Sequence, residues 1–516
     1  MALTGITTDV SLEIITYLPL SSIASLLLVQ KAWKNLVDSN AANIYRNAAA
    51  LHRFIQKADT NLADAVAALD FDATPLDIHG WKEFCRLRLD IERNWAGLGP
   101  SEMWKLEAFG EQVHHWQSMN DSHTIVSSSF RGLSVFDAYE TIWALPLDYL
   151  PAPTFFAYDQ GYLAFLRPTL NTLEVWREVS DRPFPSKPSS AQKFAATSIV
   201  ALYGPPDAGH FVPCYMLTCP EGEHISPGKS FKLHYPTLIA TTRTRIHMWD
   251  VSVGKHLRTL DSKGMLDDHG ISTSPRADIC DDYVVTFDAL QIRVFSRHDG
   301  NFLFHFSRKA GLSTYPRAMQ LLPPRKGAAL MQSQDAVFQK QVLFQKQHKW
   351  AYPRGNFNQV GLSPCGTILV ALTENNRMII IPEFQRVVTG EVEIADVAIE
   401  VKSGEEYGDL CGHPIVTRDR IAVGTEEGII IFTIDRSKAG PVPKGSVRFT
   451  TPAGTRALPV QLSASCITLE WQGRDRNLSI GGTRLFFGAA PTVVLREPLL
   501  RFTRAKRETR INHRVF

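Results

Sequence analysis

The sequence has little of what marks secreted, membrane-bound or metal-binding proteins. Its seven cysteines are scattered over 516 residues, and no two of them form a Cys-x-x-Cys pair. The odd number and the wide spacing are typical of reduced thiols and argue against a disulfide framework or a zinc site. No apolar run approaches the ~18 residues of a membrane-spanning helix, and we expect no signal peptide. We therefore expect a protein of the cytoplasm, the nucleus or both, with no metal and no membrane partner.

The short motifs of common enzymes are also missing. The sequence contains no P-loop, no Gly-x-Gly-x-x-Gly after a strand, no His-Glu-x-x-His and no Gly-x-Ser-x-Gly elbow. We expect no cofactor and no catalytic residue. An enzyme whose ionisable groups converge only in the folded chain stays open as an alternative, because such groups need no local motif.

No charge of one sign dominates. Lys and Arg number 55 against 52 Asp and Glu, so the formal charge of +3 argues neither for nor against nucleic acid. The tail "REPLLRFTRAKRETRINHRVF" (496–516) is basic and is a candidate for contact with nucleic acid, an acidic partner or a localisation receptor. It lacks aromatic residues at base-stacking spacing, so a solvated tail or a final strand is the favoured interpretation and nucleic acid is not expected.

Apolar residues are in excess near the N-terminus, in "DVSLEIITYLPLSSIASLLLVQKAWKNLV" (9–37). Their spacing predicts three short helices, with Thr8 or Asp9 capping the first and Ser21 the second. In the second helix Leu26 to Val29 are consecutive and therefore point in four directions. About 40 residues cannot cover all these side chains alone. Either the rest of the chain covers them, as in an all-helical domain closed on itself, or another protein does.

This stretch resembles an F-box. It matches the family's pattern at nine positions: Ile14, Tyr17, Leu18, Ser22, Leu26, Val29, Lys31, Trp33 and Leu36. It departs from the pattern at Ile6-Thr7, where the family has Leu-Pro, and at Gln30, where Cys or Ser is usual. The resemblance implies binding to the small Skp adaptor. The contacts and supporting core that it implies are Ile6, Val10, Ile14, Leu18, Ile23, Leu26, Leu27, Val29 and Trp33.

Helical spacing continues from Asn40 to about Gly99. In "WKEFCRLRLDIERNW" (81–95) apolar residues alternate with charges of both signs, which favours a helix with one solvated face. In F-box proteins with a WD-repeat domain, a similar segment that ends in "ERNW" joins the two parts. The resemblance implies a rigid spacer, and a plain amphipathic linker is the alternative.

Beyond Gly99 the hydrophobic period changes to that of short strands. Six segments share one layout, in which an apolar strand, a short polar turn and a second apolar strand follow each other. These are 123–137, 161–176, 236–250, 282–300, 360–383 and 419–435, and 466–488 is a weaker seventh. Recurring strand pairs of this kind indicate a repetitive all-β fold.

Two details resemble WD repeats. In "WDVSVGKHLRTL", Trp249-Asp250 closes a third strand, Gly254-Lys255 forms a turn, and Leu257 and Leu260 belong to the outer strand. "SPCGT" (363–367) resembles the Ser-Pro-x-Gly turn after the first strand pair of a repeat, and Asp299-Gly300 forms a hairpin turn. The Pro- and Ser-rich segment 180–193 is expected to be an exposed loop. Two spacings, 176–249 and 295–379, are longer than one repeat. Each holds either a degenerate blade or long loops, and the sequence does not decide between them.

A ring of four-stranded blades leaves few open sheet edges. We therefore expect a multidomain α plus all-β protein: an F-box-like domain (1–45), a helical spacer (46–99), a WD-repeat-like β-propeller (100–500) of seven or alternatively eight blades, and a basic tail (501–516). By resemblance it is the substrate receptor of a Skp–cullin–F-box ubiquitin ligase, not itself an enzyme, and it holds an unidentified target protein, phosphorylated or not. The alternatives are a propeller scaffold outside any ligase and a propeller enzyme.

Overall fold

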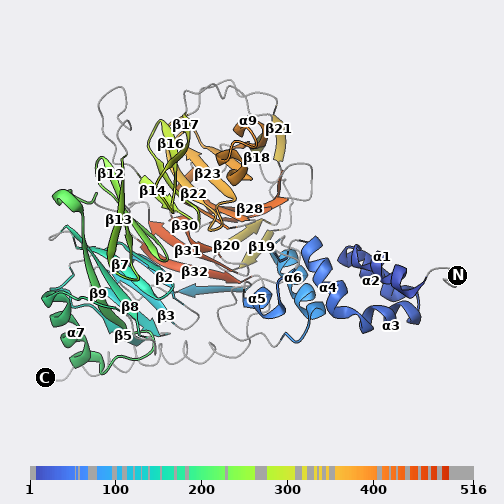
Figure 1. Cartoon of the computed structure of the whole chain (residues 1–516), viewed down its shortest axis with the longest axis horizontal. Coiled ribbons are helices and arrows are strands. Elements are labelled where there is room, and N and C mark those ends of the chain that lie inside the picture. The colour runs from blue at the N-terminus through green and yellow to red at the C-terminus, as the bar shows by residue number, and fades with distance from the viewer. Residues whose placement is uncertain are drawn as a thin grey trace. The chain divides into compact units, whose positions relative to one another are not determined.

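The computed structural model places a helical unit within residues 1–103 and a β unit within 104–463 and 467–484 (Figure 1). It describes residues 7–52, 54–55, 59–67, 78–95, 102–106, 113–119, 123–128, 131–137, 140–150, 154–167, 171–179, 185–226, 231–261, 276–307, 317–321, 330–333, 336–339, 344–347, 355–403, 410–417, 420–425, 428–435, 442–450, 455–462, 466–473 and 479–486. Within these residues the chain is mainly β, in several antiparallel sheets, with a few helices.

The helical unit contains α1 (Thr8–Thr16), α2 (Leu20–Val29), α3 (Lys31–Ser39), α4 (Ala41–Leu51), α5 (Leu62–Ala67) and α6 (Trp81–Trp95). The three short helices expected near the N-terminus are present, but their caps differ from those expected. Thr7, not Thr8 or Asp9, caps α1 by accepting the N–H of Val10. Pro19 precedes α2, which has no side-chain cap, so Ser21 lies inside the helix. Proline is well suited to this position because its fixed φ matches the chain at a helix start.

One hydrophobic core joins these helices. Ile15, Ile23 and Val37 from the first three helices are almost fully buried, and they belong to the same cluster as Trp81 and Phe84 of α6. The expected boundary at residue 45 falls inside α4, which packs against both α1 and α6. The F-box-like segment and the expected spacer therefore fold around a shared core.

The β unit is built from repeated antiparallel sheets. Three have four strands in chain order: β6 (Phe156–Asp159), β7 (Tyr162–Arg167), β8 (Thr172–Glu178), β9 (Phe211–Thr218); β10 (Phe231–His234), β11 (Thr237–Thr241), β12 (Arg245–Asp250), β13 (Lys255–Asp261); and β14 (Arg276–Ile279), β15 (Tyr283–Phe287), β16 (Gln291–Ser296), β17 (Phe302–Ser307).

The remaining sheets extend this pattern. Two sheets have six strands each. The first contains, in order across the sheet, β22 (Phe357–Leu362), β23 (Ile368–Thr373), β24 (Arg377–Pro382), β25 (Ile399–Lys402), β18 (Arg317–Leu321) and β21 (Phe344–Gln347). The second contains β26 (Leu410–Val416), β27 (Arg420–Thr425), β28 (Gly428–Asp435), β29 (Val442–Thr450), β20 (Ala336–Gln339) and β19 (Leu330–Ser333). The eight-stranded sheet holds β30 (Thr455–Leu462), β31 (Cys466–Gly473), β32 (Ser479–Phe486), β2 (Val113–Ser118), β3 (His123–Ser128), β4 (Gly132–Asp137), β5 (Glu140–Ala144) and β1 (Glu102–Leu106).

The first strands of successive four-strand series contact one another in chain order. β6 contacts β10, β10 contacts β14, β14 contacts β22, β22 contacts β26, β26 contacts β30, and β30 contacts β2. The Gln117 side chain of β2 donates a hydrogen bond to the Tyr158 carbonyl of β6 at 2.9 Å. This order of contacts is that of a propeller, in which the first strand of each blade lines the centre.

A bulge recurs where the third strand of a blade ends. The register shifts just before Phe136, Trp176, Trp249 and Phe295, each against the strand that follows next in the chain. Trp249-Asp250 ends β12 and Gly254 turns into β13, as the WD-like sequence predicts. The aromatic residues that close these strands in the sequence therefore mark one repeated structural position.

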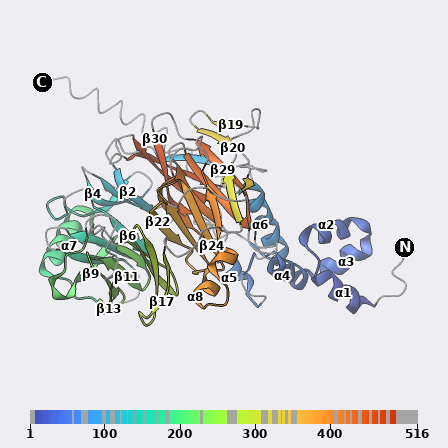
Figure 2. The ribbon, with the colours of Figure 1, turned by 90° about the horizontal axis from the view of Figure 1, so that it is seen from above.

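The two long spacings hold extra elements. Between β8 and β9 lies helix α7 (Ser190–Tyr203), shown in Figure 2. An exposed loop was expected over 180–193, and this is wrong for its last residues. Ser189 caps α7, and the side chain of Gln192 is fully buried. Between β17 and β22, strands β18 and β20 add to the outer strands β25 and β29.

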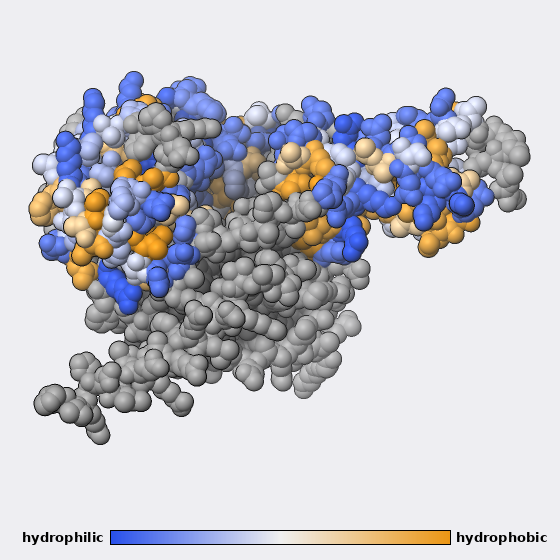
Figure 3. All heavy atoms as spheres, turned by 90° about the horizontal axis from the view of Figure 1, so that it is seen from below, coloured by the Kyte–Doolittle hydropathy of each residue, from blue (hydrophilic) through white to orange (hydrophobic). Residues whose placement is uncertain are grey.

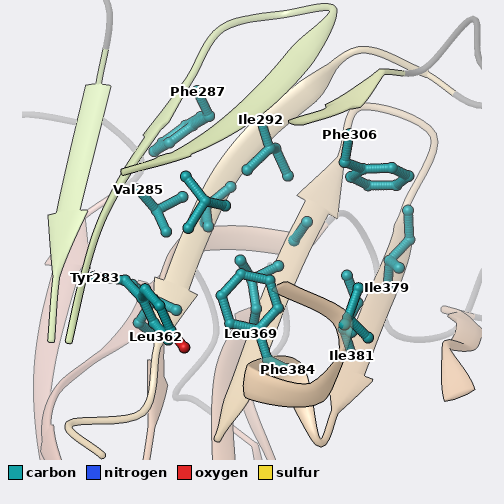
Figure 4. Close-up of a cluster of buried hydrophobic side chains, with 14 of the residues drawn as sticks. Tyr283, Val285, Phe287, Ile292, Phe306, Leu362, Leu369, Ile379, Ile381 and Phe384 are labelled. Carbon is teal, nitrogen blue, oxygen red and sulfur yellow. The ribbon is translucent and has the colours of Figure 1, made fainter. Parts of the chain in front are cut away.

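Apolar side chains fill the space between neighbouring blades. Figure 4 shows one such cluster between the β14–β17 and β22–β25 sheets, where Phe306 of β17 and Leu369 of β23 point toward each other's sheet. The short helices α8 (Phe384–Val388) and α9 (Ile394–Val397) lie between β24 and β25, and Phe384 joins the cluster. These strands are apolar on both faces because both faces meet another sheet.

Candidate functional site

The first candidate site is an apolar surface on α1 and α2, which we call the α1/α2 surface. Val10 and Ile14 are each 51% exposed and Val29 is 68% exposed. Tyr17 (71%) and Leu28 (87%) are more exposed still. Figure 3 shows apolar residues, in orange, among the polar ones on the helical unit at the right of the view. These five large apolar side chains, left in water on a small unit, are what the excess of apolar residues predicts.

A shallow hollow of about 360 Å³ opens on this surface. It is lined by Leu18, Leu26 and Val29, and by three serines, Ser21, Ser22 and Ser25. The Ser25 hydroxyl donates to the Ser21 carbonyl one turn earlier. An apolar floor with a few hydroxyls around it suits a partner side chain that is itself apolar, with polar backbone groups at the rim.

The other predicted contact residues lie deeper. Ile23 is fully buried in the core of the helical unit, while Leu18, Leu26, Leu27 and Trp33 are half-buried and pack on that core. Ile6 lies outside the described residues. Leu28 was not among the predicted contacts, although its place in the run of four apolar residues could have indicated it. The role of all these residues as adaptor contacts stays a prediction.

The second candidate site is a cluster of three ionisable side chains from the first strands of three blades. Lys232 of β10 lies with its Nζ 3.3 Å from Nε2 of His413 on β26. The same two nitrogens lie 3.9 and 3.6 Å from the carboxylate of Asp278 on β14. Asp278 also accepts the N–H of Leu362, on β22, at 3.0 Å. One carboxylate therefore contacts groups from three neighbouring strands besides its own.

The electrostatics of this cluster favour a charged Asp278. Burial alone would raise the pKa of Asp278, but Lys232, His413 and the Leu362 N–H outweigh burial, so the pKa lies below its ordinary value. A carboxylate held in this way is a poor general base, because both its oxygens are engaged and its proton affinity is low. The geometry therefore suits a structural tie between blades.

The described thiols do not form a reactive site. Cys85, Cys214, Cys219, Cys280 and Cys365 are free, and burial raises the pKa of each of the first four to about 12. No group of three His, Cys, Asp or Glu side chains among the described residues is placed to hold a metal ion. Within that same part of the chain, we find no helix with the length and apolarity that crossing a membrane requires.

Comparison with known proteins finds similarity in structure only. No protein-family model matches the sequence, and no curated protein does. Solved structures that the chain is similar to include U3-55K (TM-score 0.43), the WD40 repeats of RRP9 (0.43) and the WD40 β-propeller domain of Doa1 (0.39). Each is 10% identical and covers 75% of this chain, which in turn covers 98%, 97% and 96% of theirs. The propeller interpretation rests on the sheets and strand contacts described above.

Proposed function

We propose that the chain is the substrate-recognition subunit of a Skp–cullin–F-box ubiquitin ligase. In this role the α1/α2 surface binds the Skp adaptor and a seven-bladed propeller holds a target protein. The observation that carries the proposal is the exposure of Val10, Ile14, Tyr17, Leu28 and Val29 on helices whose sequence resembles an F-box. Val29 also lines the hollow, together with Leu18 and Leu26. The order of contacts from β2 round to β30 supports the blade count.

The exposed side chains would contribute favourable free energy to an interface with a partner. Each large apolar side chain gains ~1.5–3 kcal/mol on full burial. Five of them together offset a large part of the ~4–15 kcal/mol that association costs in lost freedom of motion. The core beneath them, which includes Ile15, Ile23 and Phe84, holds the helices in place before the partner binds.

The chain would do no bond chemistry in this role. It would hold the target close to the ubiquitin-loaded enzyme, and so raise the effective concentration of the reacting groups. In this proposal the first strands of the blades surround one centre, and a loop at one end of the blades would contact the target. No described residue is assigned to target binding by this proposal.

The test is capture of the purified Skp adaptor by the full chain and by three variants. Ile14→Asp and Val29→Asp place a charge on the α1/α2 surface at positions that are 51% and 68% exposed. Leu51→Asp is the matched control, because Leu51 is 54% exposed at the end of α4, outside the two helices that carry the α1/α2 surface. We expect the first two to lose capture and the third to keep it. Capture by Val29→Asp at the wild-type level would overturn the proposal.

Point variants are a better test than removal of residues 1–40. That deletion would also remove Ile15, Ile23 and Val37 from the core that they share with α6. Leu26→Asp with Trp33→Asp is open to the same objection, since both residues pack on that core. Unchanged thermal unfolding of Ile14→Asp and Val29→Asp would show that their loss of capture comes from the surface.

Two other functions remain distinguishable. A propeller scaffold outside any ligase would show no adaptor capture by any form of the chain. A propeller enzyme is favoured by one observation, the convergence of Lys232, Asp278 and His413. If these residues were catalytic, Lys232→Met would abolish activity without changing stability, whereas a structural tie loses stability.

A further inference from the structure

Helix α2 begins with a backbone N–H that the helix itself cannot satisfy. The residue before the helix is Pro19, which offers no side-chain cap. Its carbonyl accepts the N–H groups of Ser22 and Ile23 at 2.9 and 3.0 Å. Leu20, the first residue of α2, is only 5% exposed. Its N–H therefore needs a partner from elsewhere in the chain, because a buried and unpaired N–H is costly.

The partner of Leu20 comes from the end of another helix. Nε2 of His52 lies 3.0 Å from the backbone nitrogen of Leu20, 32 positions away in the sequence. His52 ends α4, where its own N–H donates to the Ala48 carbonyl at 2.9 Å. A backbone N–H can only donate, so Nε2 is the acceptor and carries no proton. The contact exists only while the imidazole is neutral, with its proton on Nδ1.

This hydrogen bond lies beside the hollow of the α1/α2 surface. Leu18, Ser21 and Ser22, on either side of Leu20 in the sequence, line that hollow. The Leu20 side chain belongs to the core of the helical unit, together with Ile15. The position of the first turn of α2 therefore sets the shape of the hollow, and His52 helps to fix that turn.

Burial favours the neutral form of His52. The residue is half-buried, and its ring centroid lies 5.5 Å from that of Phe54. Burial lowers the pKa of His52 from its ordinary value of 6.5. The end of α4 attracts a positive charge and the start of α2 repels one, so the two helix dipoles oppose each other at this position.

The charged groups on the neighbouring helices leave burial as the deciding influence. α2 has no ionisable side chain. From α6, Arg88 lies over the Phe54 ring at 5.3 Å and forms a salt bridge of 3.2 Å with Glu92. The remaining ionisable residues of α1, α3 and α4 and of the chain next to them are Asp9, Glu13, Tyr17, Lys31, Lys34, Asp38, Tyr45, Arg46 and Arg53. The pKa of His52 lies below its ordinary value in these surroundings.

We propose that His52 is a pH-sensitive cap on α2 that controls capture of the adaptor by the α1/α2 surface. The neutral imidazole holds the start of α2 at the end of α4. A proton on Nε2 would point at the Leu20 N–H, so the ring must turn away and leave that N–H without its partner. The first turn of α2 then loosens, and the hollow beside it changes shape. The adaptor as partner rests on the proposed function, whereas the cap itself does not.

The lowered pKa sets the direction of the pH effect. The unfolded chain takes up a proton on His52 at a higher pH than the folded chain does. The stability that the cap contributes is therefore complete above about pH 6.5 and is lost as the pH falls through the lower folded pKa. Mild acid should loosen the α1/α2 surface, and a return to neutral pH should restore it.

The experiment measures binding of a fluorescently labelled Skp adaptor to the full chain by anisotropy, at about pH 7.5 and about pH 5.5. The informative variant is His52→Gln, because an amide oxygen near the position of Nε2 can accept the Leu20 N–H but does not titrate. His52→Leu removes the acceptor at every pH. His79→Gln is the matched control, because His79 is exposed and is the other histidine of residues 1–103.

We expect the wild type and His79→Gln to bind the adaptor roughly fivefold to tenfold more weakly at the lower pH, since an unpaired buried N–H is worth about that factor. His52→Gln should bind equally well at both pH values, and His52→Leu should bind weakly at both. An effect of pH on the adaptor itself is common to all forms, so the comparison with His52→Gln removes it.

Hydrogen exchange of α2, followed by mass spectrometry, tests the cap without the adaptor. After correction for the intrinsic effect of pH on exchange, the first turn of α2 should exchange faster in acid in the wild type and not in His52→Gln. Exchange that responds in this way in a chain that captures no adaptor at either pH would support the cap and overturn the proposed function.

Two results would overturn the cap. One is an equal loss of adaptor binding in acid by the wild type and His52→Gln, which would place the titrating group elsewhere. The other is corrected exchange of α2 in the wild type that is the same at both pH values, because the start of the helix would then not depend on the protonation of His52.

Discussion

Arg377 and Glu400 form a salt bridge of 2.9 Å between β24 and β25, and both side chains are almost fully buried, with 4% and 2% exposed. The pair lies beside apolar residues of the cluster that includes Met378 and Ile399. Each of these two buried charges compensates the other. Burying either charge without its partner would cost a large free energy of desolvation.

We expect that breaking this pair by removal of one partner destabilises the β unit strongly. Glu400→Gln leaves the Arg377 charge without its carboxylate, which costs about 3–5 kcal/mol in buried pairs. The double variant Arg377→Met, Glu400→Leu removes both charges and should lose much less. Urea unfolding measured for both forms checks this. A single variant as stable as the wild type would show that water reaches Arg377.

Asp278 should make stability depend on pH only in acid. Its pKa is lowered in the folded chain, since Lys232, His413 and the Leu362 N–H outweigh the effect of burial. Such a group contributes stability that is complete above the unfolded pKa, near 3.8, and is lost as the pH falls through the lower folded pKa. Asp278→Asn should therefore cost about 1–3 kcal/mol at pH 7, and the difference from the wild type should shrink below about pH 4. A difference that stays constant down to pH 2 would assign the loss to packing.

The parts of this fold that could be predicted are those with local signals. Trp249-Asp250 followed by Gly254 marks the end of a third strand and a turn within a few residues, and the structure places them there. Helix α7 also had a local signal, the Ser189-x-x-Gln192 capping box, which the preceding prolines obscured.

Other features had no local signal. Lys232 and His413 lie 181 positions apart, and their meeting with Asp278 depends on the closure of the sheets. The pairing of β18 with β25 and of β20 with β29 likewise joins segments far apart in the sequence. At the α1/α2 surface, spacing indicated too many apolar residues, but which of them face water was fixed by the core shared with α6.

Gly254 should tolerate no side chain. Its φ is +66°, and an added Cβ would lie 2.3 Å from Cδ1 of Tyr215. That ring is held in place, because its hydroxyl donates to the Pro185 carbonyl. Gly254→Ala should therefore combine backbone strain with a clash, at a cost of about 1–3 kcal/mol. The matched control is Gly390→Ala, where φ is +76° and nothing lies within 4 Å, so that only the strain is felt. Equal losses in thermal unfolding would show that Tyr215 moves aside.

Ser189 should stabilise α7 and, through it, the hydrogen bond that the Gln192 side chain donates to the Tyr215 carbonyl of β9. Its hydroxyl accepts the N–H of Gln192, and the Gln192 side chain accepts the N–H of Ser189. Ser189→Ala removes half of this exchange and should cost about 1 kcal/mol. Thr197→Ala is the control, because Thr197 is exposed in the middle of α7 and alanine is the better helix former. Hydrogen exchange of the Gln192 amide should speed up in the first variant and stay unchanged in the second. Unchanged exchange in both would mean that packing of Ala195 and Ile199 on the β unit holds the helix start without its cap.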